Sequence, residues 1–188
     1  IVNDQSYSDK QKNIFSAWTD RAQYRCGKIF RLLNPLKAIC EITNLGDNEN
    51  WNVLLIGNSH ADSLKTSFAK TFEQNNIGVY YYVPNNLLMT DTYDEVAVAR
   101  DAAKLSVNAV VLHYDIGAYN DSVISRISAL ANHLRAQDVR LFLISPVPSF
   151  NVHIPKHLYR MTRSNLAPPH QIASDHYYKT ASFWRAAH

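Results

Sequence analysis

Ser59 is the residue of this chain whose type and setting best suit covalent chemistry. An apolar run of strand type, residues 53–56, stops at Gly57, and a helical pattern begins directly after Ser59. A serine on such a turn lies exposed at the carboxyl edge of a sheet and at a helix N-terminus, where free N–H groups favour developing negative charge. These conditions suit the nucleophile of an acyl transfer. A plain helix cap is the competing interpretation, because serine and asparagine are ordinary cap residues.

The elements that must position Ser59 alternate between strand and helix. Strands are expected at residues 52–56, 79–83, 109–112 and 139–144, and helices at residues 10–24, from the Ser59 turn to 74, and at 93–105, 121–136 and 171–187. Residues 145–170 contain five prolines and are expected to form a loop. The alternation predicts a three-layer α/β/α sandwich with a parallel sheet. The continuous apolar run of the last strand further predicts that both of its faces are covered.

In such a sheet the ligand crevice lies beyond the carboxyl ends of the strands. Those ends are the Ser59 turn, residues 84–86, residues 113–115 and residues 145–146. Four separate segments are therefore predicted to surround one site.

The tetrad Gly57-Asn58-Ser59-His60 resembles the first block of the SGNH (GDSL-like) hydrolase family. Its Gly-Asp/Asn-Ser-His form is typical of the extracytoplasmic domain fused to acyltransferase-3 membrane proteins, which O-acetylate bacterial surface polysaccharides. The resemblance is clear over residues 26–72 and loose from there to residue 188. It implies an SGNH-hydrolase, flavodoxin-like α/β fold with Ser59 as the nucleophile.

The family's general base is a histidine in an Asp-x-x-His motif after the last strand, and no such motif occurs in these 188 residues. The final strand and helix of the fold also have no counterpart in the predicted elements. Either the chain stops before the motif or this member is inactive, and the first explanation is favoured because a structural strand is missing as well. We therefore expect an N-terminal extension over residues 1–50 and a C-terminally incomplete SGNH-like domain over residues 51–188.

Four further residues are candidates for the neighbourhood of Ser59. The family's oxyanion donors are the serine's own N–H, a glycine N–H in a second block and an asparagine in a third. Here the second block has Asn86 and no glycine, and the third, at residues 113–117, reads His-Tyr-Asp-Ile-Gly. Asn58, Asn86 and His113 are the candidate donors or crevice-lining residues, although all three can equally be turn residues. His60 adjoins Ser59 and is expected to bond a nearby loop, since it is badly placed to act as a base for its neighbour.

Composition excludes several classes of protein. The chain has 188 residues and a formal charge of +3 with interspersed signs, which fits one globular domain and does not indicate nucleic-acid binding. No apolar run is long enough to cross a membrane. His153 and His157 stand at helical spacing, but Pro155 between them disfavours a helix, so no metal site is expected.

Cys26 and Cys40 are an even pair that fits a disulfide, and two buried thiols are the alternative. The resemblance implies a similar pair in acyltransferase-fused relatives, and it therefore favours the disulfide and an oxidising compartment.

The resemblance implies a periplasmic domain of an inner-membrane protein. Ser59 would pass an acetyl group to a sugar hydroxyl of a surface polysaccharide such as lipopolysaccharide O-antigen. The attached membrane domain would supply the acetyl group from acetyl-CoA, and no cofactor is expected on this domain itself. A carbohydrate acetylesterase and a non-catalytic glycan-binding module remain the alternatives.

Overall fold

The computed structural model describes residues 8–9, 11–12, 26, 32–33, 38–43, 45, 51–82, 94–147 and 154–161. The chain divides into two compact units, one over residues 22–146 and the other over residues 1–21 and 147–188. The first unit contains the sheet and Ser59.

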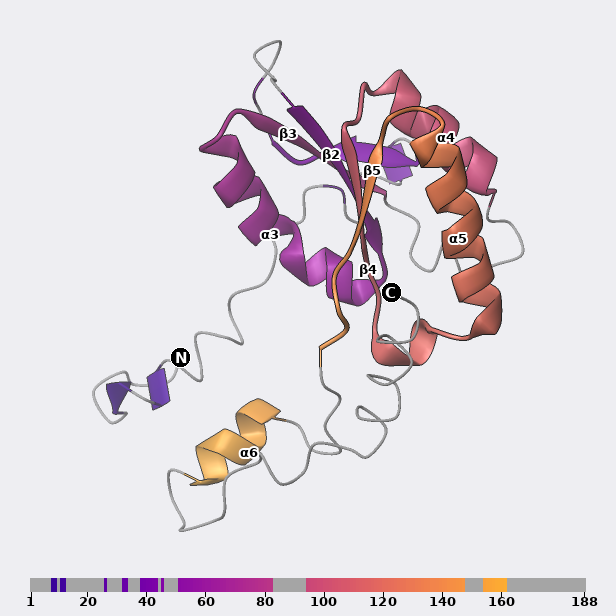
Figure 1. Cartoon of the computed structure of the whole chain (residues 1–188). Helices are drawn as coiled ribbons and strands as arrows, with labels where there is room; N and C mark the ends of the chain where they lie inside the picture. The colour runs from indigo at the N-terminus through magenta and orange to yellow at the C-terminus, as the bar shows by residue number, and fades with distance from the viewer. Residues whose placement is uncertain are drawn as a thin grey trace. The chain divides into compact units, whose positions relative to one another are not determined.

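A sheet of five strands forms the centre of this unit, in the order β1-β3-β2-β4-β5 (Figure 1). Its strands are β1 (Ile39–Glu41), β2 (Trp51–Gly57), β3 (Ile77–Tyr82), β4 (Ala109–His113) and β5 (Arg140–Leu143). The pairs of β2 with β3, of β2 with β4 and of β4 with β5 are parallel. Only β1 runs antiparallel, along the outer side of β3. The predicted α/β architecture is therefore confirmed, with an antiparallel edge strand that the sequence pattern did not reveal.

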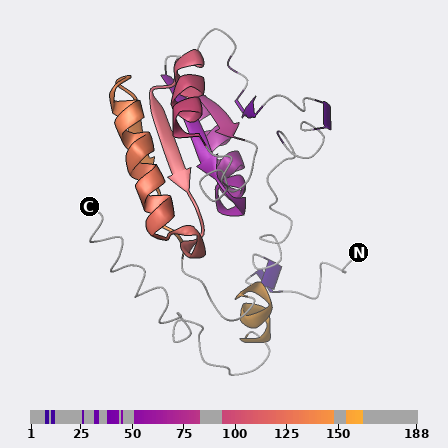
Figure 2. The same cartoon turned by 90° about the vertical axis from the view of Figure 1, so that its right-hand side faces the viewer.

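Helices cover both faces of the sheet, which accounts for its apolar strands. The helix α3 (Ser59–Glu73) lies on one face, and α4 (Glu95–Lys104) and α5 (Asp121–Arg135) pack together on the other (Figures 1 and 2). Leu54, Leu55 and Ile56 of β2 and Leu112 of β4 have no exposed surface. On α5 the stripe Val123, Ile127, Leu130 and Leu134 is buried, as its helical spacing predicts. Each such side chain contributes roughly 1.5–3 kcal/mol by leaving water.

The strand β5 departs from its prediction. Arg140 and Phe142 are exposed, and Phe142 keeps 47% of its surface in solvent. The expectation that both faces of this strand are covered was therefore wrong. In the described part of the chain β5 is the last strand of the sheet and pairs only with β4, so it has neighbours on one side alone.

A disulfide joins Cys26 to Cys40, with 5.6 Å between the two Cα atoms. Both cysteines are buried, and Cys40 lies on β1, so the bond ties residue 26 to the edge of the sheet. This pairing agrees with the one that the family resemblance favoured.

We expect loss of this disulfide to lower the free energy of unfolding by about 3 kcal/mol, because the bond closes a loop of 14 residues in the unfolded chain. Urea unfolding of the Cys26→Ala/Cys40→Ala double variant measures the effect. Dithiothreitol should lower the stability of the wild type and leave that of the double variant unchanged. Equal stability of the two proteins under oxidising conditions would contradict the prediction.

The second unit contains α6 (Ile154–Met161). It lies within the region expected to be a loop, and that expectation was wrong at this point. Pro155 is the second residue of the helix, and the first turn tolerates proline because its N–H groups have no partner within the helix. The helix predicted over residues 171–187, and residues 10–24 apart from 11–12, lie outside the described residues. None of the helices in the described part of the chain has the length and hydropathy that a membrane crossing requires.

Candidate functional site

The strand-turn-helix unit predicted around Ser59 is present. The strand β2 ends at Gly57, Asn58 caps the next helix, and Ser59 is the first residue of α3. The Asn58 side-chain oxygen accepts a hydrogen bond from the His60 backbone N–H at 3.1 Å. Ser59 itself is exposed, whereas Asn58 beside it is only 6% exposed. The hydroxyl of Ser59 is therefore accessible and lies at the positive end of a helix of 15 residues.

Gly57 allows β2, β4 and α3 to meet at this point. It lies opposite His113 in the parallel pair of β2 and β4. A Cβ atom at position 57 would lie 1.9 Å from the His113 carbonyl oxygen and 2.6 Å from the Ala61 Cβ. Only glycine fits this close approach, and the turn that presents Ser59 starts from it.

A hydrogen bond between side chains joins the Ser59 turn to the loop after β4. The Asn58 amide nitrogen donates to the Asp115 carboxylate. The other oxygen of that carboxylate accepts from the Gly117 backbone N–H at 2.8 Å, which caps a short 3-10 helix at Ile116–Ala118. Two of the four predicted loops are thus brought into contact. The sequence placed residues 113–115 at this edge of the sheet, but it did not single out Asp115.

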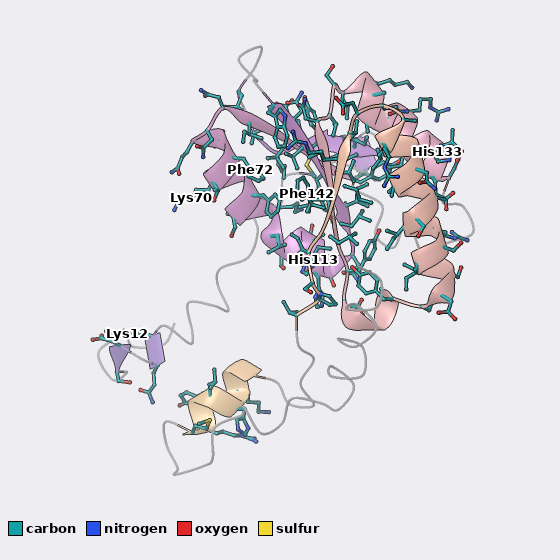
Figure 3. All side chains as sticks on the ribbon, in the orientation of Figure 1. Lys12, Lys70, Phe72, His113, His133 and Phe142 are labelled. Carbon is teal, nitrogen blue, oxygen red and sulfur yellow. A yellow bond between two sulfur atoms is a disulfide. The ribbon has the colours of Figure 1, made fainter. Side chains whose placement is uncertain are left out.

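His60 and His113 lie side by side next to this contact. Their ring centroids are 5.8 Å apart, and the rings are tilted by 56°. His113 is 2% exposed, and its Nδ1 lies 3.3 Å from the Ile144 carbonyl oxygen, which makes Nδ1 the protonated nitrogen of the neutral ring. The loop after β5 is therefore held at the same edge. His113 is the last residue of β4 and lies opposite Gly57, next to the Ser59 turn (Figure 3).

Burial lowers the pKa of His113 from its ordinary value of 6.5; the Ile144 backbone opposes this shift and nearby His60 adds to it. The unfolded chain then binds a proton at His113 more readily than the folded protein does. Stability from this group is fully present above pH 6.5 and is lost as the pH falls from there toward the folded pKa.

The free energy of unfolding of the wild type should decrease between about pH 7.5 and about pH 5.5. We expect a smaller decrease in His113→Gln, because glutamine cannot titrate. Urea unfolding at the two pH values measures this difference. His133→Gln is the matched control, because His133 is exposed on α5, away from His113 (Figure 3). An unchanged pH dependence in His113→Gln would contradict the assignment.

Lys65 is a buried cation on α3 that the sequence reasoning did not identify. It is 4% exposed, and its Nζ lies 2.5 Å from an Asp62 carboxylate oxygen. The same Nζ lies 4.7 Å from the centre of the Tyr81 ring. These contacts fix the first turns of α3 against β3. The ion pair was visible as an i, i+3 pair in the sequence, but burial of the lysine depends on the packing of α3 on the sheet.

The remaining candidates can be placed as follows. Asn58, His60 and His113 gather around the Ser59 turn, while Asn86 lies outside the described residues. Among the residues that the structure describes, no three His, Cys, Asp or Glu side chains gather as metal ligands. The arrangement offers an exposed hydroxyl at a helix N-terminus with buried polar side chains behind it. Such a site can stabilise negative charge that develops beside the hydroxyl.

Residues 25–188 match the model of the family described as SGNH domain (fused to AT3 domains). No match to a curated protein was found. Since the matched region covers most of the chain, and the mostly parallel sheet with its helices fits an α/β fold of that family, this chain belongs to the family of SGNH domains fused to AT3 domains.

Proposed function

We propose that this domain is an O-acetyltransferase that uses Ser59 to carry an acetyl group to a sugar hydroxyl of a bacterial surface polysaccharide. The observation that carries the proposal is the position of Ser59, which is exposed at the N-terminus of α3 and at the carboxyl end of β2. Membership of a family whose domains are fused to AT3 domains supports an acyl-transfer module.

In the first step the Ser59 oxygen attacks the carbonyl carbon of the acetyl donor. A C–O bond forms to the serine, the donor's leaving group departs with the electron pair of its bond to the acetyl carbon, and the serine proton passes to a base and then to the leaving group. In the second step the sugar oxygen attacks the acetyl carbon and the sugar hydroxyl gives its proton to the same base. The bond between the acetyl carbon and the Ser59 oxygen then breaks, the Ser59 oxygen takes the proton from the base, and the acetylated sugar leaves. The family's base, the histidine of an Asp-x-x-His motif, does not occur in these 188 residues.

The first turn of α3 would stabilise the negative charge that develops in both steps. Backbone N–H groups at a helix start point toward such a charge, and the helix dipole lowers its energy. Asn58 keeps this turn in place by capping it. The nucleophile and the groups that stabilise this negative charge are therefore both provided by this chain's own residues.

The donor, the compartment and the acceptor are further parts of this proposal, and the fusion of the family's domains to AT3 domains supports them. We propose that an AT3 membrane domain supplies the acetyl group from acetyl-CoA and that this domain works in the periplasm on lipopolysaccharide O-antigen or a similar glycan. The disulfide between Cys26 and Cys40 supports an oxidising compartment. With water in place of the sugar hydroxyl, the same site would be a carbohydrate acetylesterase.

A non-catalytic glycan-binding module is the second candidate, and two observations favour it. The chain has no Asp-x-x-His motif, and Asp115 and its neighbours stand where the family has its Gly-x-Asn-Asp block. This candidate predicts affinity for the glycan with no covalent chemistry at Ser59.

Covalent labelling separates the two candidates. The full-length protein is treated with a small activated acetyl ester, digested, and searched by mass spectrometry for a gain of one acetyl group. We expect the adduct on the peptide that contains Ser59, and we expect it to disappear in Ser59→Ala. A folded protein that gains no adduct there would overturn the transferase and leave the glycan-binding module.

A further inference from the structure

Asn58 and Asp115 form a contact whose donors and acceptors fit in one arrangement only. The Asn58 oxygen accepts from the His60 N–H, so its amide nitrogen is the atom that faces Asp115. The Asp115 carboxylate can only accept, and it receives the Asn58 amide on one oxygen and the Gly117 N–H on the other. Every hydrogen-bonding atom in this chain of contacts is therefore matched to a partner of the opposite kind.

The contact joins two loops that are far apart in the sequence. Asn58 lies between β2 and α3, and Asp115 follows β4, 57 residues later. Asn58 is buried and immediately precedes Ser59, whose position depends on how α3 starts. A buried polar side chain without a hydrogen-bond partner raises the free energy of the folded state. We therefore expect the Asn58 amide to turn or shift if Asp115 cannot accept from it.

We propose that Asp115 is a positioning residue for Ser59, which acts through Asn58 and holds the first turn of α3 in its reactive geometry. This inference rests on the proposed function, because it requires that Ser59 reacts. Asp115 does not need to touch the substrate for this role. Its carboxylate fixes the Asn58 amide, and the amide fixes the helix start.

Exchange of the two side chains gives a sharp test. In Asn58→Asp two carboxylates face each other. Because both can only accept hydrogen bonds, the bond between positions 58 and 115 has no donor and is lost. In Asp115→Asn a single amide oxygen must serve two donors, so one hydrogen bond is lost. In the double variant the carboxylate at 58 accepts from the His60 N–H and from the new amide at 115, and the oxygen of that amide accepts from the Gly117 N–H. All three hydrogen bonds are then restored with the polarity reversed.

We expect the rate of Ser59 acetylation to fall about 10-fold or more in each single variant and to return to within about threefold of wild type in the double variant. The rate is measured on the full-length protein with the activated acetyl ester, and the free energy of unfolding is measured in parallel. Asn120→Asp and Asp94→Asn are matched controls, because they make the same changes at the caps of α5 and α4. Both controls should react at the wild-type rate.

Three outcomes would overturn the inference. Folded single variants that react at the wild-type rate would show that the contact does not position Ser59. A folded double variant that stays as slow as the single variants would show a direct role for one of the two side chains, such as donation by the Asn58 amide to the oxyanion. A wild-type protein that gains no acetyl adduct would overturn the proposed function, and this inference with it. If the wild type gains the adduct but the substitutions at positions 58 and 115 do not change the acetylation rate, this inference alone is overturned. If Asn58→Asp does not fold, Asp115→Asn and the double variant still decide the outcome.

Discussion

Replacement of Ser59 by alanine is expected to lower the rate of acetyl transfer by about 1,000-fold or more, because loss of a nucleophile removes the covalent route and leaves only binding and oxyanion stabilisation. Ser59 is exposed at the start of α3, so the substitution should leave the free energy of unfolding within about 1 kcal/mol of wild type. The acetyl content of the isolated polysaccharide, from cells that carry each variant, measures the effect.

The matched control is Ser63→Ala. Ser63 is also exposed on α3, one turn further along, but its hydroxyl donates to the His60 carbonyl oxygen at 2.6 Å. It should keep the wild-type level of acetylation. Acetylation that persists in Ser59→Ala, in a cell without a second enzyme of this kind, would show that another residue carries the acetyl group.

Replacement of Gly57 by alanine is expected to lower the free energy of unfolding by about 3 kcal/mol. The added methyl group would lie 1.9 Å from the His113 carbonyl oxygen, which belongs to the backbone of β4 and cannot rotate away. Either β2 and β4 separate at this point or α3 moves off the sheet, and both changes displace Ser59. Acetylation should therefore fall together with stability, as measured by urea unfolding and by labelling of Ser59.

Gly117→Ala is the control for this substitution. A Cβ atom at position 117 would meet only an Asp115 carboxylate oxygen, at 3.0 Å, and Gly117 is exposed. The expected loss of stability is below about 1 kcal/mol. Equal stability of Gly57→Ala and Gly117→Ala would show that β2 can move away from β4 without cost, and that the close approach is not what requires glycine.

The local parts of the site could be predicted from the sequence because their causes lie within a few neighbouring residues. A run of apolar residues that ends in Gly57-Asn58-Ser59 specifies a buried strand, a turn and a helix start by itself. The spacing of Val123, Ile127, Leu130 and Leu134 likewise specifies the buried side of α5. The order of these elements along the chain was enough to indicate the α/β fold.

The sequence did not reveal the strand β1 or the exposure of β5. A strand of three residues, Ile39–Glu41, has too few positions for a pattern, and it exists because β3 offers a free edge. Phe142 has the apolar character of a buried residue, and its exposure depends on how far the helices extend over the sheet: α3 packs on β2, β3 and β4, and α5 packs on β5. Strand pairing and helix packing are both decided between distant segments.

The sequence by itself determined that Ser59 lies exposed on a strand-to-helix turn of an α/β domain. Only the tertiary structure decided what lies behind that serine: the Asn58–Asp115 hydrogen bond, the His60–His113 pair and the buried Lys65. Turn and helix preferences act over a few residues, so they are legible in the sequence. Contacts across the sheet edge depend on the parallel register that sets Gly57 opposite His113, and this register is fixed by the packing of the whole core.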